Sequence, residues 1–158
     1  MAADQTGARR ATVEDADAIG RLLHDFNTEY DQDSPGAAVL ASRLRVLLAG
    51  DRTFALVSGE PPLAVALVTL RPNVWYQGQV ALLDELYVVP DHRNEGIGSS
   101  LVALLLSTAR AGAVELVEIN VDEGDIDAQR FYERHGFVAQ AWAGATERSF
   151  SYWQELTT

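Results

Sequence analysis

The segment from residue 82 to residue 101 carries residue types that can bind an anion. A mostly apolar run ends at Val89, and Arg93, Gly96 and Gly98 follow before an apolar stretch with helical spacing. The first N–H groups of a helix have no partner inside it, and the helix dipole adds partial positive charge there. Glycines let a phosphate approach those amides, and an arginine adds charged donors. This spacing predicts a phosphate-binding turn in a chain of formal net charge −11.

Other interpretations of this turn compete with that one. A dinucleotide-binding turn requires a third glycine, and Leu101 stands at its position; the Gly-Lys-Ser/Thr of a phosphate loop is also missing. For a lone Gly-x-Gly, an ordinary loop whose glycines begin a helix is the favoured interpretation. A second motif downstream overturns this interpretation and favours the phosphate-binding turn.

The remaining sequence predicts a mixed sheet with helices on its faces. Apolar residues alternate or recur every three to four positions, and turn residues separate these runs. Thr12 to Asp15 reads as a capping box ahead of a helix, and Ser34-Pro35 reads as the start of a second helix that Gly50 ends. The predicted strands are 8–11, 53–57, 63–70, 80–89, 114–121, 137–142 and 148–156, and two further helices are 96–111 and 125–135. No linker or repeat interrupts the chain, so we expect a single domain, 1–158.

Composition narrows the classes of partner. An acidic chain of 158 residues is poorly suited to coating nucleic acid or an anionic membrane. No apolar run approaches the roughly 20 residues of a membrane span, and no signal peptide is visible, so we expect a cytoplasmic protein. The sequence has no cysteine, which excludes disulfides, thiolate metal sites and cysteine nucleophiles. The three histidines show no metal-ligand spacing, and we expect no metal.

Two motifs together resemble the GNAT superfamily of acyl-CoA-dependent N-acyltransferases. The first is Arg93-x-x-Gly96-x-Gly98 after Leu86-Tyr87-Val88-x-Pro90, and the second is Asp125-x-x-Ala128-x-x-Phe131-Tyr132-x-x-x-Gly136-Phe137. The resemblance implies an α/β (α+β) fold with a mixed, mostly antiparallel, twisted sheet of about seven strands and about four helices on both faces. It also implies that a central parallel pair, 80–89 and 114–121, splays to bind acetyl-CoA.

The resemblance assigns the co-substrate to backbone groups of the first motif. The pantetheine arm is expected to pair with Leu86, Tyr87 and Val88, an edge-strand mode of recognition. The pyrophosphate is expected on the amides of Arg93, Asn94, Glu95, Gly96, Ile97, Gly98, Ser99 and Ser100. Asn94 stands where glycine is common in the family, Glu95 has the wrong charge beside an anion, and Asp125, also expected to contact acetyl-CoA, replaces the usual asparagine.

The resemblance also assigns roles in acetyl transfer. Tyr132 is expected near the sulfur of acetyl-CoA. There it would contact the co-substrate and act as the general acid for the departing thiolate. Glu85 is the preferred base, through water, and Asp84 is the second choice. Strand alternation predicts that these two carboxylates face opposite sides of the sheet; a structural charge is the alternative for either. The Val88 N–H is expected to polarise the thioester carbonyl.

The acceptor is expected to be a primary amine on a cationic small molecule. Phe26, Glu29 and Tyr30 lie where the family's acceptor site borders the first two helices, and they could hold a cation through charge and ring faces. A solvated acidic turn is the alternative. The function expected is therefore an acetyl-CoA-dependent N-acetyltransferase. The alternatives are a protein lysine or N-terminal acetyltransferase and a non-catalytic acyl-CoA sensor. A homodimer is compatible with the family.

Overall fold

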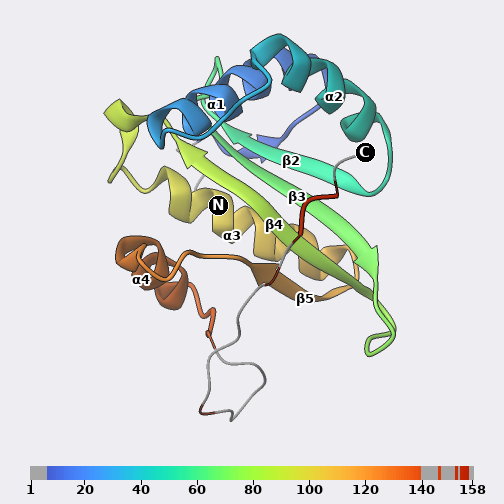
Figure 1. Cartoon of the computed structure of the whole chain (residues 1–158). Helices are drawn as coiled ribbons and strands as arrows, with labels where there is room; N and C mark the ends of the chain where they lie inside the picture. Colours follow the sequence, from blue (N-terminus) through green and yellow to red (C-terminus); the bar gives the residue numbers. More distant parts are fainter. Residues whose placement is uncertain (1–6, 140–145, 147–151, 153, 157–158) are drawn as a thin grey trace. The chain divides into compact units, whose positions relative to one another are not determined.

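The structure is a computed structural model that describes residues 7–139, 146, 152 and 154–156 (Figure 1). Its contacts divide the chain into two units, residues 1–119 and 120–158. The first unit contains β1 (Arg9–Arg10), the 3₁₀ turn η1 (Val13–Asp15), α1 (Ala16–Glu29), α2 (Ala37–Ala49), β2 (Thr53–Ser58), β3 (Ala64–Pro72), β4 (Gln79–Val88), the 3₁₀ turn η2 (Pro90–His92), α3 (Ile97–Ala111) and β5 (Val114–Ile119). The second contains α4 (Ile126–Arg134).

The described sheet has five strands in the order β1-β2-β3-β4-β5. Its first four strands pair antiparallel, and β4 pairs parallel to β5. Helices α1 and α2 lie on one face of this sheet, and α3 lies on the other (Figure 1). The mixed α/β architecture predicted from the sequence is therefore confirmed, including the parallel pair.

The expectation of about seven strands is not confirmed. The last two predicted strands, 137–142 and 148–156, lie largely outside the described residues, and residues 137–139 form no strand. The other predicted strands and the helices 96–111 and 125–135 agree with the structure to within two residues at each end.

The core between the sheet and the first two helices is built from the inward residues of each strand. Ala55 and Val57 of β2, Val65 of β3 and Tyr87 of β4 are at most 4% exposed. They pack with Ile19 and its neighbours on α1 and with Leu44 of α2. Because successive residues of a strand face opposite sides, this set identifies which side chains of β3 and β4 face α1 and α2.

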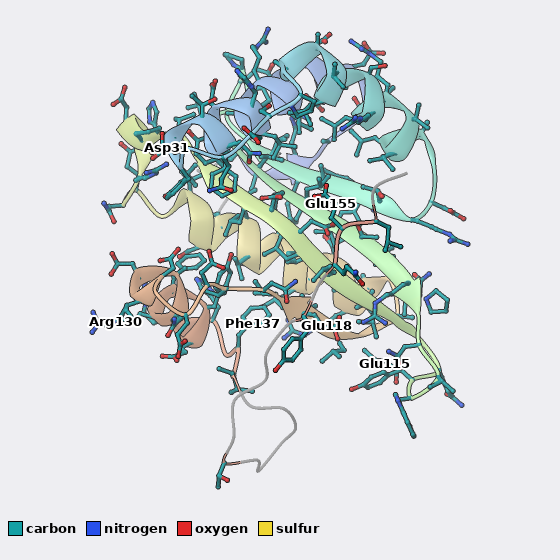
Figure 2. All side chains as sticks on the ribbon, in the orientation of Figure 1. Asp31, Glu115, Glu118, Arg130, Phe137 and Glu155 are labelled. Carbon is teal, nitrogen blue, oxygen red and sulfur yellow. The ribbon has the colours of Figure 1, made fainter. Side chains whose placement is uncertain are left out.

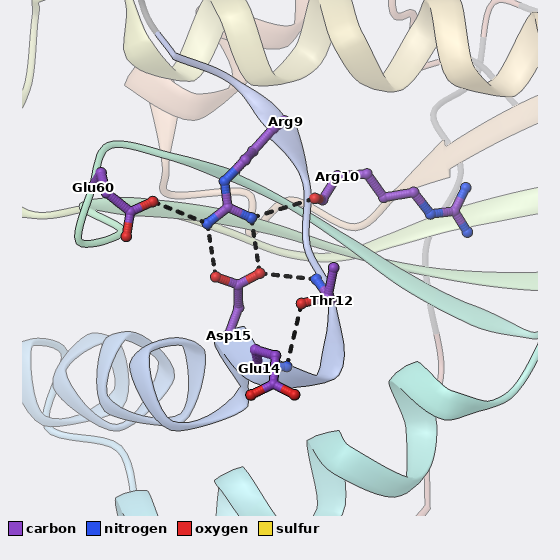
Figure 3. A network of polar contacts seen from close by, with 6 residues as sticks. All are labelled: Arg9, Arg10, Thr12, Glu14, Asp15 and Glu60. Atoms are coloured by element: carbon purple, nitrogen blue, oxygen red, sulfur yellow. Dashed lines mark hydrogen bonds and ion pairs between the residues drawn. The ribbon is translucent and has the colours of Figure 1, made fainter.

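The predicted capping box is confirmed at the N-terminus of the helical layer (Figure 3). The Thr12 hydroxyl accepts from the Glu14 N–H at 3.3 Å, and the Asp15 carboxylate accepts from the Thr12 N–H at 2.8 Å. Both nitrogens of the Arg9 fork donate to Asp15 at 2.8 Å. This network ties β1 to the helix that follows it.

The predicted start of the second helix is wrong by two residues. Helix α2 begins at Ala37 after Gly36, whose φ of 98° only glycine adopts readily. Ser34 does not cap this helix: its hydroxyl accepts from the Gly36 N–H at 3.2 Å and bonds to His24 Nδ1 at 2.8 Å. The positive φ of Gly36 turns the chain, so the helix starts only beyond it.

Side-chain bonds fasten the parallel pair along its ladder. Arg71 of β3 reaches across β4 to Glu118 of β5 at 2.7 Å, and the Gly78 N–H donates to the Glu115 carboxylate. Figure 2 labels the two glutamates of β5. These bonds hold β4 and β5 together along the ladder, so any separation of the two strands must occur beyond Leu83 and Ile119.

Candidate active site

Strand β4 continues beyond its parallel partner. The ladder with β5 runs from Gln79 to Leu83 and stops at Ile119, the last residue of β5, whereas β4 extends to Val88. The Val89 N–H donates to the Leu63 carbonyl at 3.0 Å, on the β3 side. Since backbone groups alternate between the two edges of a strand, Leu86 and Val88 direct theirs to the open edge and Tyr87 directs its own to β3. Of the three residues expected to pair with pantetheine, only Leu86 and Val88 present backbone groups there.

The turn after β4 has the geometry of an anion cradle. Asn94 and Gly96 have φ angles of 63° and 83°, and α3 begins directly after Gly96. The first intrahelical bond runs from the Ser100 N–H to the Gly96 carbonyl at 3.0 Å. The amides of Ile97 and Gly98 therefore have no acceptor inside the helix. Glu95 is exposed and lies 3.1 Å from His92 Nδ1.

The Arg93 side chain binds the C-terminal end of α1. Its Nη1 and Nη2 donate to the two carboxylate oxygens of Glu29 at 2.6 and 2.7 Å. Its Nε donates to the Val88 carbonyl at 3.0 Å. Glu29 also accepts from the Tyr87 hydroxyl at 3.0 Å. Glu29, expected to bind the amine, is instead engaged by Arg93.

The other two residues expected to hold the amine pack against this group. Phe26 stacks on the Tyr87 ring, with centroids 5.1 Å apart and planes 28° apart. Tyr30 meets Phe26 edge-on at 5.3 Å and is 54% exposed. Phe26, Glu29 and Tyr30 thus surround Tyr87 and Arg93, and none of them lines the cavity described below.

A β-bulge changes the expected placement of the two carboxylates. Leu67 of β3 pairs with Glu85 and Val68 pairs with Leu83, so Asp84 is an extra residue without a partner opposite it. The extra residue shifts the alternation, and both carboxylates therefore point to the face that α1 and α2 cover. The prediction that they face opposite sides is wrong for this reason.

Asp84 and Glu85 line one cavity of about 450 Å³ between the sheet and the two helices. The rest of the lining comes from α1, α2, β2 and β3: Leu23, Asn27, Leu40, Leu47, Thr53, Leu67 and Thr69. Sequence reasoning missed all seven. Leu23 and Asn27 are four residues apart on α1, as neighbours on one helix face are. The bulge that turns both carboxylates to this face cannot be foreseen from the sequence, so no sequence signal connects Leu23 and Asn27 with them.

The cavity raises the pKa of both acids. Burial away from water raises the pKa of Asp84, and a hydrogen bond from the Thr69 hydroxyl at 2.5 Å partly opposes that effect. Burial also raises the pKa of Glu85, and the neighbouring Asp84 charge adds to it. A carboxylate with a raised pKa is a stronger base, as proton abstraction requires.

The second unit holds the downstream motif on its own helix. Asp125 caps α4 by accepting from the Ala128 N–H at 3.0 Å, as expected of an aspartate at this position. The Tyr132 ring lies edge-on to Phe131 and Phe137, with centroids 5.1 and 5.8 Å away. These contacts fix the ring within α4 and its C-terminal turn. The catalytic role of Tyr132 stays a prediction.

The described residues gather no group of three or more His, Asp or Glu side chains that could hold a metal ion. None of their helices is long and apolar enough to cross a membrane.

This fold is similar to that of known acetyltransferases. Residues 16–137 match the model of the acetyltransferase (GNAT) family. An aminoalkylphosphonate N-acetyltransferase of Salmonella typhimurium is 29% identical over 136 residues, which cover 82% of each chain. A solved structure from Arthrobacter sp. FB24, assigned as an acetyltransferase, is 47% identical, covers 99% of each chain and superposes with a TM-score of 0.90.

A more distant structure has the same fold. An aminoglycoside acetyltransferase from an uncultured soil metagenomic sample, solved in complex with sisomicin, is 17% identical over 95% of each chain, with a TM-score of 0.77. The family match covers most of the chain and spans the parallel strands, the glycine turn and α4. The chain belongs to the GNAT family of acetyltransferases, whose co-substrate is acetyl-CoA.

Proposed function

We propose that this protein transfers the acetyl group of acetyl-CoA to the primary amine of a small molecule, by direct attack within a ternary complex. The observation that carries the proposal is the pair Asp84 and Glu85, which the bulge brings together in one cavity. A free alkyl amine titrates near ~10.4 and is mostly protonated at neutral pH. The site must therefore take a proton from the amine before the amine can attack.

Glu85 is the residue that we assign to this proton transfer, directly or through one water. Its pKa is raised by burial and by the Asp84 charge, which makes it a better proton acceptor than an exposed glutamate. The Val88 N–H, on the open edge, donates to the thioester oxygen as charge develops there. Tyr132 returns a proton to the thiolate. Because the sequence has no cysteine, no acetyl-cysteine enzyme is formed.

The cavity lining defines the kind of amine. Four leucines and two carboxylates line it, and no Lys, Arg or His side chain is found in this described lining. A bound ammonium satisfies both carboxylates, and a hydrocarbon body satisfies the leucines. The name of the Salmonella relative implies a substrate with a phosphonate group. In this cavity a phosphonate would lie against the negative charges of Asp84 and Glu85, with no cationic side chain in the described lining to pair with it. We therefore propose an amine with an apolar body and no anionic group.

The test is a thiol-release assay with amines of matched length. Butylamine, 1,4-diaminobutane and 3-aminopropylphosphonate are offered with saturating acetyl-CoA. We expect kcat/KM for the first two to exceed that for the phosphonate by at least about tenfold, roughly 1.4 kcal/mol. Preference for the phosphonate would overturn the substrate class. Coenzyme A binding by calorimetry without thiol release from any amine or peptide would support the sensor alternative instead.

A further inference from the structure

Both carboxylate oxygens of Glu29 are already engaged within the protein. One carboxylate oxygen accepts from Arg93 at 2.6 Å, and the other accepts from Arg93 at 2.7 Å and from the Tyr87 hydroxyl at 3.0 Å. Its side chain is 28% exposed, against 34% for Arg93. A two-bond fork between guanidinium and carboxylate is the most directional ion pair available to a protein.

This ion pair acts on the strand that borders the co-substrate site. The third donor of Arg93, Nε, bonds the Val88 carbonyl at 3.0 Å. That carbonyl lies on the open edge of β4, the same edge to which the Val88 N–H points. Three hydrogen bonds of one planar guanidinium therefore connect the C-terminal end of α1 to the residue whose amide we assign to the thioester.

The ring contacts keep the guanidinium in this position. The guanidinium carbon of Arg93, Cζ, lies 5.6 Å from the centre of the Tyr87 ring, and Phe26 stacks on that ring. Tyr87 is 4% exposed and belongs to the core between the sheet and the first two helices. Arg93 is thus positioned by a buried aromatic ring and by the Glu29 carboxylate together.

We propose that Glu29 is a positioning residue: through Arg93 it holds the open edge of β4 at Val88 in the orientation that accepts acetyl-CoA. We call the Glu29, Arg93 and Val88 contacts the brace. The inference rests on the proposed function, because it assigns the edge of β4 to acetyl-CoA. It also leaves phosphate binding to the backbone amides at the start of α3, without the Arg93 side chain.

Two roles for Arg93 give opposite results in a Glu29→Gln variant. If the Arg93 charge binds the pyrophosphate, loss of the Glu29 charge frees that charge and tightens coenzyme A binding. If the brace positions Val88, the same substitution weakens the fork and lowers both coenzyme A affinity and kcat. Glutamine keeps the length of glutamate and an oxygen acceptor for Tyr87, so the fold is preserved.

The experiment measures coenzyme A affinity by calorimetry, and both KM values and kcat by thiol release, for wild type and four variants. These are Glu29→Gln, Arg93→Lys, the double variant, and Asp17→Asn as a control. Asp17 lies on the same helix and pairs with Arg45 at 2.6 Å on an exposed surface. We expect about a tenfold loss of coenzyme A affinity in each brace variant, an unchanged KM for the amine, and no change in Asp17→Asn.

The double variant separates a brace from two independent contacts. Residues that act as one unit show strongly non-additive effects, so we expect the double variant to lose no more affinity than Glu29→Gln alone. Tighter binding in Glu29→Gln, or a raised KM for the amine alone, would overturn the brace and leave the acetyltransferase proposal intact. Failure of the wild-type protein to bind coenzyme A would instead refute the proposed function.

Discussion

Thr69 donates a hydrogen bond to Asp84 over 2.5 Å, across the bulge that interrupts the pairing of β3 with β4. No described residue donates a hydrogen bond to the neighbouring Glu85 side chain. Both acids line the same cavity, but one is held by a hydroxyl and the other is available to accept a proton. This difference assigns them different roles: Glu85 as the base, and Asp84 as a fixed charge that tunes it.

Replacing Glu85 by glutamine tests the base directly. The substitution removes the proton acceptor at almost constant volume, so we expect kcat/KM for the amine to fall by about 10²–10³-fold. In the wild type, activity should fall as the pH drops through the raised pKa of Glu85. We call this fall the acidic limb of the pH profile, and Glu85→Gln should lose it. A thiol-release pH profile measures both. An unchanged limb in this variant would show that another group titrates there.

Replacing Asp84 by asparagine should move the acidic limb without abolishing it. The Asp84 charge is one of the two causes of the raised pKa of Glu85, and removing it lets that pKa fall. Glu85 then stays ionised to lower pH, so the limb should shift in the acidic direction. Asparagine keeps an oxygen that accepts from Thr69. Loss of the limb in Asp84→Asn, with its retention in Glu85→Gln, would exchange the two assignments.

Tyr132→Phe tests the proposed general acid. Phenylalanine keeps the ring that contacts Phe131 and Phe137, so the stability of α4 should be preserved. Without the hydroxyl, we expect kcat to fall by about 10²-fold while coenzyme A affinity changes little. Calorimetry alongside steady-state kinetics separates these quantities. Equal losses of turnover and affinity would point to a packing role.

Asp15→Asn tests the N-terminal network rather than the chemistry. The hydrogen bonds from Arg9, the largest cause, and from the Thr12 N–H hold the pKa of Asp15 below its usual value. A lowered pKa in the folded state means that this stabilisation is present above about pH 4, the unfolded value, and is lost as the pH falls through the folded pKa.

Since Arg9 is 39% exposed, we expect Asp15→Asn to cost about 1 kcal/mol at pH 7 in urea unfolding. The difference from wild type should shrink below about pH 4. Asp17→Asn, which breaks an exposed pair, should cost under about 0.5 kcal/mol. An Asp15→Asn cost that does not depend on pH would show that the carboxylate charge contributes nothing to stability.

The sequence predicted the glycine turn and the parallel strands because each has a local signal. Arg93, Gly96 and Gly98 follow a buried strand at fixed spacing, and the strand itself is a run of apolar residues. The bulge at Asp84 has no such signal, since it depends on how β3 pairs with β4. The partner of Glu29 is likewise set by the fold, because 64 positions separate it from Arg93.

Gly96→Ala tests whether the left-handed start of α3 serves acetyl-CoA. Gly96 has a φ of 83°, and no atom lies within 4 Å of the position that an added Cβ would take. Alanine there brings backbone strain of about 1 kcal/mol and no clash. Gly36, before α2, offers the same situation with a φ of 98°, also with open space around it. Both substitutions should lower the free energy of unfolding by similar amounts.

Only Gly96→Ala should raise the KM for acetyl-CoA, because relief of its strain rotates the peptide planes that aim the Ile97 and Gly98 amides. We expect a rise of about three- to tenfold, with the KM for the amine unchanged in both variants. Equal KM values for acetyl-CoA in Gly36→Ala and Gly96→Ala would mean that those amides do not hold the pyrophosphate. Phosphate binding would then have to be sought elsewhere on the turn, beginning with the Arg93 side chain.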